Sequence, residues 1–513
     1  MENSRTGNVI RNVSWATLLQ VLLMILQFVA RTFFIQRLGK DYLGITGLFS
    51  DIVWILELAN MRIPDAIILS MYKPLSEKDY AKVRAIIHFF RKACFIISFA
   101  IMVIGLFFIP LLPYIIKDPP HIPENFTIMY LFYLFEKVFI YLFIYKKSII
   151  FADQKDYIVN IYLKASHFLQ IILQIIILLT IRNFYLFLLA EIFTTVVMTF
   201  MINYKANKLY PFIIKKNTEK LKKEEVSEIF VNVKSMFLYG LGSATLIGID
   251  SILVSSIVGI GVLGLCTNYL LIINSVKALI DQAMTGFTAS IGNLNVEKDI
   301  VKTEETFNQV NFIVFMVAGF CAVNMGASLD YLIDVWLGES FLISRAITIS
   351  LVLRFYIQAT QYTTFTFRST LGLMKKWKMI PIVTAVVNIA SSIVMGKYFS
   401  AAGIFFASSI AIFFCTIIPE AILLYKFIFT KSSRIFFLRY IGYLFFLSAN
   451  YLITCIILDK INFSGWAGFF GRATTGAVIS GILFIIIFFR DKNFIDLVDR
   501  IVYMIKDRKN REE

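Results

Sequence analysis

Residues 30–53 read ARTFFIQRLGKDYLGITGLFSDIV, and this stretch sets charged side chains at the edges of two strongly apolar runs. Arg31 closes the run WATLLQVLLMILQFVA, and Asp51 opens the next one. A charge near the middle of a bilayer costs about 2.5–3.5 kcal/mol on insertion scales. We therefore expect both side chains to face protein or water and not lipid.

The composition is that of a membrane protein. Of the 513 residues, 58% are hydrophobic and 16% are charged, and the mean hydropathy is +0.75. Soluble domains have roughly 45–50% apolar and about 25% charged residues. Apolar stretches of about 20 residues recur along the chain, and each is long enough to cross a bilayer as a helix. The first run is not expected to be a cleavable signal peptide, because RTFFIQRLG follows it in place of a small-residue cleavage site.

The sequence thus predicts an all-α polytopic protein, and its apolar runs mark about fourteen transmembrane helices. The connections after the even-numbered spans are rich in Lys and Arg, whereas VGIGVLG carries no charge and DYLIDVWLGES is acidic. By the positive-inside rule, both termini are expected in the cytoplasm. The predicted spans are 13–36, 44–70, 89–112, 125–146, 158–181, 183–205, 229–257, 262–291, 306–327, 342–368, 379–398, 403–426, 435–458 and 467–489.

The net charge of +16 is explained by these basic loops, which meet anionic lipid headgroups, so nucleic acid is not an expected partner. No glycine-rich phosphate loop and no metal-ligand cluster is present in the sequence. We therefore expect no catalytic residues, no metal and no cofactor, and we do not expect an enzyme. The cysteines stand singly in apolar segments and suggest neither a disulfide framework nor a metal site: Cys94, Cys266, Cys321, Cys415 and Cys455.

An internal repeat divides the chain. When the sequence is shifted by 220 residues, Leu43-Gly44 falls on Leu263-Gly264, and Glu77-Lys78-Asp79 falls on Glu297-Lys298-Asp299. We read two six-helix lobes related by a parallel pseudo-repeat, an arrangement that places substrate between lobes in transporters. The predicted domains are an N-lobe (1–205), a basic cytoplasmic linker (206–228), a C-lobe (229–426), two extra C-terminal helices (427–489) and a cytoplasmic amphipathic tail (490–513).

Polar side chains share single faces of several spans, since positions 4, 7 and 11 apart lie on one side of a helix. Such faces must meet protein or a water-filled cavity. The predicted substrate-cavity residues are Arg31, Arg62, Lys277, Arg354, Gln27, Asn274 and Gln358, and the face of span ten continues to Arg368. The candidates for coupling to H⁺ or Na⁺ are Asp51, Asp65, Asp250 and Asp281. The alternative is interhelical glue: Lys277 and Asp281 are four residues apart and can simply pair.

The opening stretch resembles the amino-terminal signature of polysaccharide exporters. The signature combines Arg31 late in the first helix with Leu38-Gly39, Asp41-Tyr42 and Gly44. The chain thus resembles the polysaccharide transporter branch of the multidrug/oligosaccharidyl-lipid/polysaccharide exporter superfamily, which includes Wzx-type O-antigen flippases. By topology the resemblance spans nearly the whole chain, and it implies a MATE-like fold.

The resemblance implies a flippase of the bacterial inner membrane. Such a protein moves undecaprenyl-pyrophosphate-linked oligosaccharide across that membrane by alternating access, for the biosynthesis of surface polysaccharide such as lipopolysaccharide. The implied partners are this lipid-linked oligosaccharide, membrane lipids and other polysaccharide assembly proteins. Arg and Lys suit such cargo, because they neutralise the anionic pyrophosphate.

Three alternatives stay open. A lipid II flippase would share the fourteen spans and the anionic cargo. A drug or organic-cation antiporter of the same superfamily would need an acidic, aromatic cavity, whereas the polar faces here are mixed. A membrane-embedded polysaccharide polymerase would carry its catalytic groups on a large outer loop, and even the connection around KDPPHIPEN is short.

Overall fold

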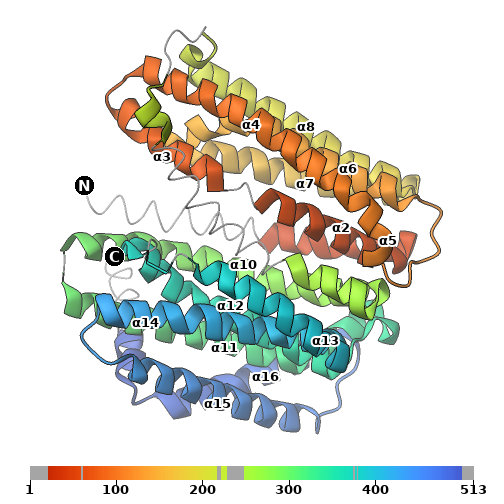
Figure 1. Ribbon diagram of the computed structural model, residues 1–513. Coiled ribbons are helices and arrows are strands. Elements are labelled where there is room, and N and C mark those ends of the chain that lie inside the picture. The colour runs from red at the N-terminus through yellow and green to blue at the C-terminus, as the bar shows by residue number, and fades with distance from the viewer. Residues whose placement is uncertain are drawn as a thin grey trace, which may run out of the picture. The chain divides into compact units, whose positions relative to one another are not determined.

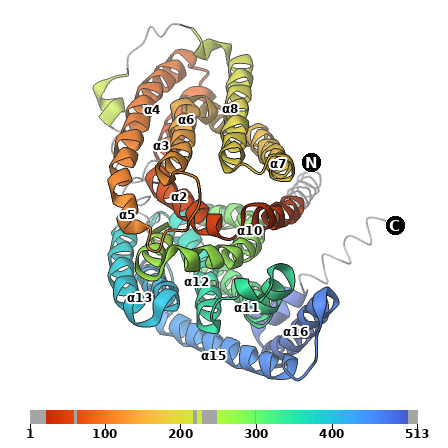
Figure 2. The same cartoon turned by 90° about the vertical axis from the view of Figure 1, so that its right-hand side faces the viewer.

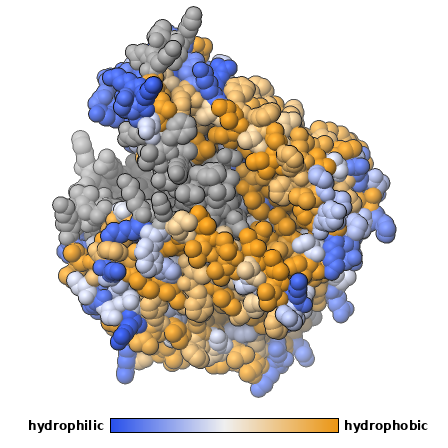
Figure 3. Space-filling model, in the orientation of Figure 1, coloured by the Kyte–Doolittle hydropathy of each residue, from blue (hydrophilic) through white to orange (hydrophobic). Residues whose placement is uncertain are grey.

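The computed structural model describes residues 21–58, 62–215, 221–227, 248–297, 299–373, 376–377 and 379–499. These residues form helices and contain no strand, and ten of their helices are long and apolar enough to cross a membrane. On the face seen in Figure 3, apolar side chains cover the flanks of the helices. Ile96, Phe99 and Phe107 of one helix are all at least 69% exposed, as lipid-facing side chains would be. The predicted all-α polytopic membrane fold is confirmed, and the count of fourteen spans stays a prediction.

The helices fall into two compact units. The N-unit comprises the described parts of Leu19–Thr267 with Pro381–Ile389, and the C-unit those of Asn268–Ile380 with Ala390–Glu513. The segment from 248 to 267 therefore packs with the N-unit, although it follows the basic linker in the sequence.

The N-unit is built from long antiparallel helices, with α6 packed between α4 and α8, and α7 against α8 (Figures 1 and 2). The second predicted span, 44–70, consists of two helices, α2 and α3, with 59–61 between them outside the described residues. The elements are Val21–Leu38, α2 (Asp41–Leu58), α3 (Arg62–Ser76), α4 (Tyr80–Phe108), α5 (Leu112–Ile115), α6 (Phe126–Ala152), α7 (Asp156–Thr180), α8 (Phe184–Leu209), the short turn η2 (Pro211–Ile213) and Gly248–Val258.

In the C-unit, α11 packs against α12, α15 and α16. The elements are α10 (Ile260–Glu297), α11 (Ile300–Leu337), the short turn η4 (Glu339–Phe341), α12 (Arg345–Thr370), α13 (Ile380–Ile412), the π-helical turn η6 (Phe413–Ile417), α14 (Ile418–Phe427), α15 (Ser433–Leu458) and α16 (Gly465–Phe488). The α10 helix begins within the N-unit's residue range, and residues Pro381–Ile389 of α13 also group with the N-unit.

Predicted spans eleven and twelve join without a loop. The chain reverses within α13 at Ser400, whose φ of 58° is left-handed. A Cβ atom on Gly403 would lie 2.2 Å from the Met395 carbonyl oxygen, so this turn requires glycine at that position.

The repeat has a local structural counterpart. Asp79 caps α4 by accepting a hydrogen bond from the Lys82 amide at 3.0 Å, and Asp299 caps α11 by accepting one from the Lys302 amide at 3.0 Å. Matched sequence positions therefore perform matched roles at the starts of equivalent helices.

The described start of the tail, residues 490–499, contacts the C-unit. Residues 492–499 are helical, and Lys492 pairs with Glu305 at 3.7 Å while Gln309 donates to Asp496 at 3.3 Å. Residues 500–513 of the predicted amphipathic tail lie outside the described residues, so that tail stays a prediction.

Candidate functional site

The polar face of the first helix turns toward its own unit. Arg31 is half-buried and interacts electrostatically with Tyr133 of α6. One turn earlier, the Gln27 amide nitrogen lies 3.4 Å from Nε2 of His167 on α7. These two side chains thus meet protein, as the cost of exposing them to lipid requires.

A second polar contact joins α2 to the segment Gly248–Val258. The Ser251 hydroxyl donates to the Asp51 carboxylate, and the neighbouring Asp250 is almost completely buried. The helices approach closely here, because a Cβ on Gly248 would lie 2.5 Å from Ile55 Cγ1 and 3.1 Å from the Asp51 carbonyl oxygen. Two coupling candidates, Asp51 and Asp250, therefore lie near each other in the N-unit.

The repeat-related glycines also meet in this contact. A Cβ on Gly264 would lie 2.9 Å from the Gly44 amide nitrogen, and a Cβ on Gly44 would lie 2.2 Å from the Ile260 carbonyl oxygen. The Lys117 ammonium also contacts this part of the chain, where it donates a hydrogen bond to the Ile257 carbonyl oxygen at 2.8 Å. Small residues let helix backbones pack this closely in membranes.

The remaining candidates of the N-unit lie on α3. Asp65 is half-buried in the first turns of this helix, and Arg62 is its first residue. The side chain of Arg62 lies outside the described part of the chain, so its predicted role stays a prediction.

In the C-unit, Lys277 and Asp281 form an ion pair within α10, with 2.6 Å between Nζ and Oδ2. Asn274 is exposed one turn earlier. On α12 the Arg354 guanidinium lies 5.7 Å from the ring centre of Phe405, and Gln358 is half-buried. The local pairing of Lys277 with Asp281 thus occurs, while convergence of these residues on a cavity between lobes stays a prediction.

A buried charge network in the N-unit lies outside the predicted set. Glu136 of α6 is buried, accepts a hydrogen bond from the Thr195 hydroxyl at 2.9 Å and lies 3.4 Å from the Lys137 ammonium. Glu191 of α8 and Glu57 of α2 interact electrostatically with the same lysine. Each is a charge within an apolar run, a signal that was available in the sequence. They are absent from the predicted set because that set required several polar side chains on one face of a helix, and Glu57, for example, lies off the face of Asp51.

Arg368, on the predicted polar face of span ten, is completely buried against Glu420 of α14, with 3.0 Å between Nη1 and Oε1. Its other terminal nitrogen, Nη2, donates to the carbonyl oxygens of Lys376 and Trp377 at 3.1 and 3.3 Å. The Thr364 hydroxyl completes the site by donating to Glu420 at 2.8 Å. This arginine ties helices and a connection together inside the unit.

Among the described residues, no group of three or more His, Cys, Asp and Glu side chains is placed to hold a metal ion. The candidate site consists of guanidinium, ammonium and carboxylate groups on membrane-spanning helices, and several of these groups are paired. Such groups bind and release charged partners by electrostatic complementarity.

No known family pattern matches the sequence, and no curated protein matches it. Solved structures do match. The lipid II flippase MurJ, in an inward closed conformation, has a TM-score of 0.63 at 16% identity over 92% of this chain and 98% of its own. An inward-facing MATE family multidrug resistance transporter of the MOP superfamily has 0.61 at 14% identity, over 79% of this chain and 96% of its own. A mutant of the Vibrio cholerae MATE transporter VcmN has 0.58 at 14%, over 82% and 98%.

These matches establish the fold of the protein. The chain has the helical membrane fold that MATE transporters and MurJ share, as the sequence predicted. At these identities the likeness establishes architecture alone, and it does not separate the polysaccharide branch from the others.

Proposed function

We propose that the protein is a flippase that moves an undecaprenyl-pyrophosphate-linked oligosaccharide across the bacterial inner membrane by alternating access of two lobes. The observation that carries this proposal is Arg31. It lies on a membrane helix, it turns toward the protein interior, and among the described residues it forms no ion pair with a carboxylate. The paired N–H donors of such a guanidinium are available to bind a pyrophosphate.

The solved structures of similar fold support transport as the kind of function. One is named as a lipid II flippase and another as a multidrug resistance transporter. A lipid II cargo for this chain is the second candidate, because the MurJ structure covers more of this chain than the MATE structures do. Both candidates share an anionic lipid-linked cargo, and Asp51, Asp65, Asp250 and Asp281 are the proposed residues for H⁺ or Na⁺ coupling.

Complementation of a strain deficient in polysaccharide export tests the proposal. We expect Arg31→Ala to abolish surface polysaccharide without lowering the amount of protein in the membrane. Arg31→Lys should keep part of the function, because the charge survives while the bidentate fork is lost. Arg37→Ala is the matched control, since Arg37 lies on the same helix but is exposed.

Normal export from Arg31→Ala would remove Arg31 from the substrate site. A parallel assay in cells depleted of their lipid II flippase separates the two cargoes. Rescue of those cells, without rescue of polysaccharide export, would favour lipid II.

A further inference from the structure

The chain beyond α8 does not leave the N-unit at once. We call residues 210–215 and 221–227 the strap, with 216–220 outside the described residues. We call the end of the N-unit that carries the connections 77–79 and 153–155 its basic end. The strap follows α8. It contacts the connection 153–155 through Tyr210 and the start of α4, next to the connection 77–79, through Glu225.

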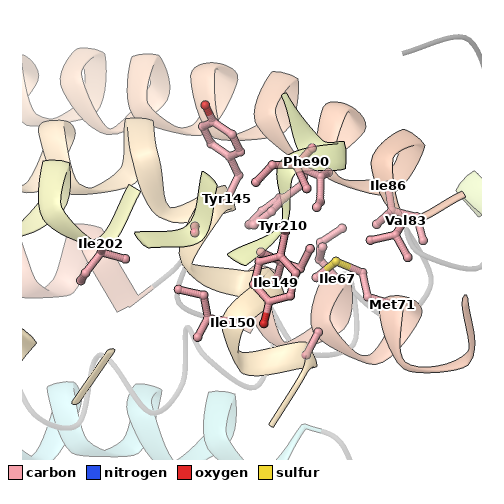
Figure 4. Close-up of a cluster of buried hydrophobic side chains, with 14 of the residues drawn as sticks. Ile67, Met71, Val83, Ile86, Phe90, Tyr145, Ile149, Ile150, Ile202 and Tyr210 are labelled. Atoms are coloured by element: carbon pink, nitrogen blue, oxygen red, sulfur yellow. The ribbon is translucent and has the colours of Figure 1, made fainter. Parts of the chain in front are cut away.

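One half of the strap is apolar and anchored in a core. Tyr210 and Ile213 belong to a buried cluster with Val83, Ile86 and Phe90 of α4, part of which is drawn in Figure 4. The cluster continues through Ile67 and Met71 of α3 and Ile149 and Ile150 of α6. This half thus joins α3, α4, α6 and α8 through buried hydrophobic contacts.

Aromatic and polar contacts secure the same half. The ring of Phe212 lies 4.6 Å from that of Tyr80. The Tyr210 hydroxyl donates to Asp153 at 2.7 Å, and the Lys155 ammonium reaches the same carboxylate at 2.7 Å. The Tyr210 ring is buried, so this half of the strap is held mainly by hydrophobic contact and not by charge.

The other half of the strap is held mainly by charge. Glu225 pairs with Lys82 of α4 at 2.6 Å, and its second oxygen accepts a hydrogen bond from the Lys222 amide at 3.0 Å. The Lys82 and Glu225 side chains are 39% and 29% exposed, so water and salt reach them. Leu221 packs only partly buried against the core. An exposed ion pair of this kind is weak and screened by salt.

We propose that the strap fastens the basic ends of the N-unit helices into one body and that the Lys82–Glu225 pair is its releasable lock. The anchored half, 210–215, stays in place, while 221–227 opens and closes. The chain after α8 is therefore held against the N-unit helices as far as Glu225 when the lock is closed, and only as far as residue 215 when it opens. This inference does not depend on the cargo.

The pH dependence of the lock has a definite sign. The Lys82 ammonium and the Lys222 amide, as donors to Glu225, hold the pKa of that carboxyl below its ordinary value. The contribution of the pair is therefore present above the ordinary pKa and is lost as the pH falls through the lowered one. The other charged groups near the pair are the Lys222 ammonium, which acts on Glu225, and Asp79 and Glu77, which act on Lys82.

Hydrogen–deuterium exchange of the full-length protein in nanodiscs tests the lock. Lys82→Glu and Glu225→Lys should each raise amide exchange in 221–227 by about 1.5- to fivefold, the range for an exposed ion pair. The double variant with the charges swapped, Lys82→Glu with Glu225→Lys, should restore slow amide exchange. Exchange in 210–215 should not change in any variant, because hydrophobic contacts hold that half.

Two controls make the result decisive. Raising salt from about 0.05 to about 0.5 M should reproduce the faster exchange in the natural protein and add little in the single variants. Lys73→Glu should have no effect on 221–227, since the one ion pair that Lys73 forms among the described residues is with Glu77, at 4.0 Å. Unchanged exchange in both single variants, failure of the double variant to recover, or an equal effect of Lys73→Glu would overturn the proposal.

Discussion

The end of the N-unit that carries Asp79 and the end of the C-unit that carries Asp299 begin alike and differ beyond these residues. Asp79 and Asp299 cap equivalent helices with the same hydrogen bond. Beyond the caps, the N-unit is fastened by the exposed Lys82–Glu225 pair, whereas the C-unit is fastened by the buried Arg368–Glu420 pair. One end can thus respond to salt and pH, and the other is fixed by the low dielectric around its charges.

The two units nevertheless share one kind of contact, between the residue that follows one helix and the start of another. In the C-unit, Thr430 follows α14 and donates to Glu304 of α11 through its amide and hydroxyl, at 3.2 and 3.1 Å. In the N-unit, Tyr210 follows α8 and packs in the core beside α4. Both units therefore join the end of the last helix of the repeat to the start of its third helix. The repeat preserves the connection while the chemistry of the fastening diverges.

The largest effect is expected from breaking the buried pair. Glu420→Ala leaves the Arg368 charge buried without its carboxylate, and we expect a loss of about 3–5 kcal/mol in the free energy of unfolding. Replacing both residues by Met should recover much of this loss, because no buried charge then remains. Denaturant unfolding in detergent measures both, with Glu339→Ala in an exposed turn as the control. A loss below about 1 kcal/mol for Glu420→Ala would contradict the contrast between the two ends.

A medium effect, equal in the two units, is expected from the caps. Asp79→Ala and Asp299→Ala should each cost about 1 kcal/mol, because each leaves a helix amide without its acceptor. Asp79→Asn and Asp299→Asn should retain most of the stability, since asparagine also caps. The same unfolding assay applies, and unequal losses in the two alanine variants would show that the repeat does not extend to these helix starts.

The smallest effect is expected from the anchored half of the strap. Tyr210→Phe removes the hydrogen bond to Asp153 but keeps the buried ring, and Lys155 still pairs with that carboxylate. We therefore expect a loss near the low end of the usual range, about 0.5 kcal/mol. Tyr210→Ala, which also empties the core position, should cost several times more. Equal losses in the two variants would mean that the hydrogen bond and not the ring holds the strap.

Local features of the molecule were visible in the sequence. Apolar runs of about 20 residues fix membrane helices because hydrocarbon accepts only backbone groups that are bonded internally. The capping aspartates and the Lys277–Asp281 pair were equally accessible, since each involves residues three or four apart on one helix. That Arg31 and Gln27 turn away from lipid also follows from the cost of exposing them there.

Only the tertiary structure decided which distant polar groups meet. Arg368 and Glu420 are 52 residues apart, Glu136 and Thr195 are 59 apart, and the sequence gives no reason to pair them. The packing of 248–267 with the N-unit was likewise not deducible, because a glycine-rich helix carries no mark of the partner it approaches. Periodicity tells which side of a helix is polar, because that depends on residues a few positions apart. Which helix covers that side depends on how the whole chain packs, and that is why a set of polar faces could be predicted while their partners could not.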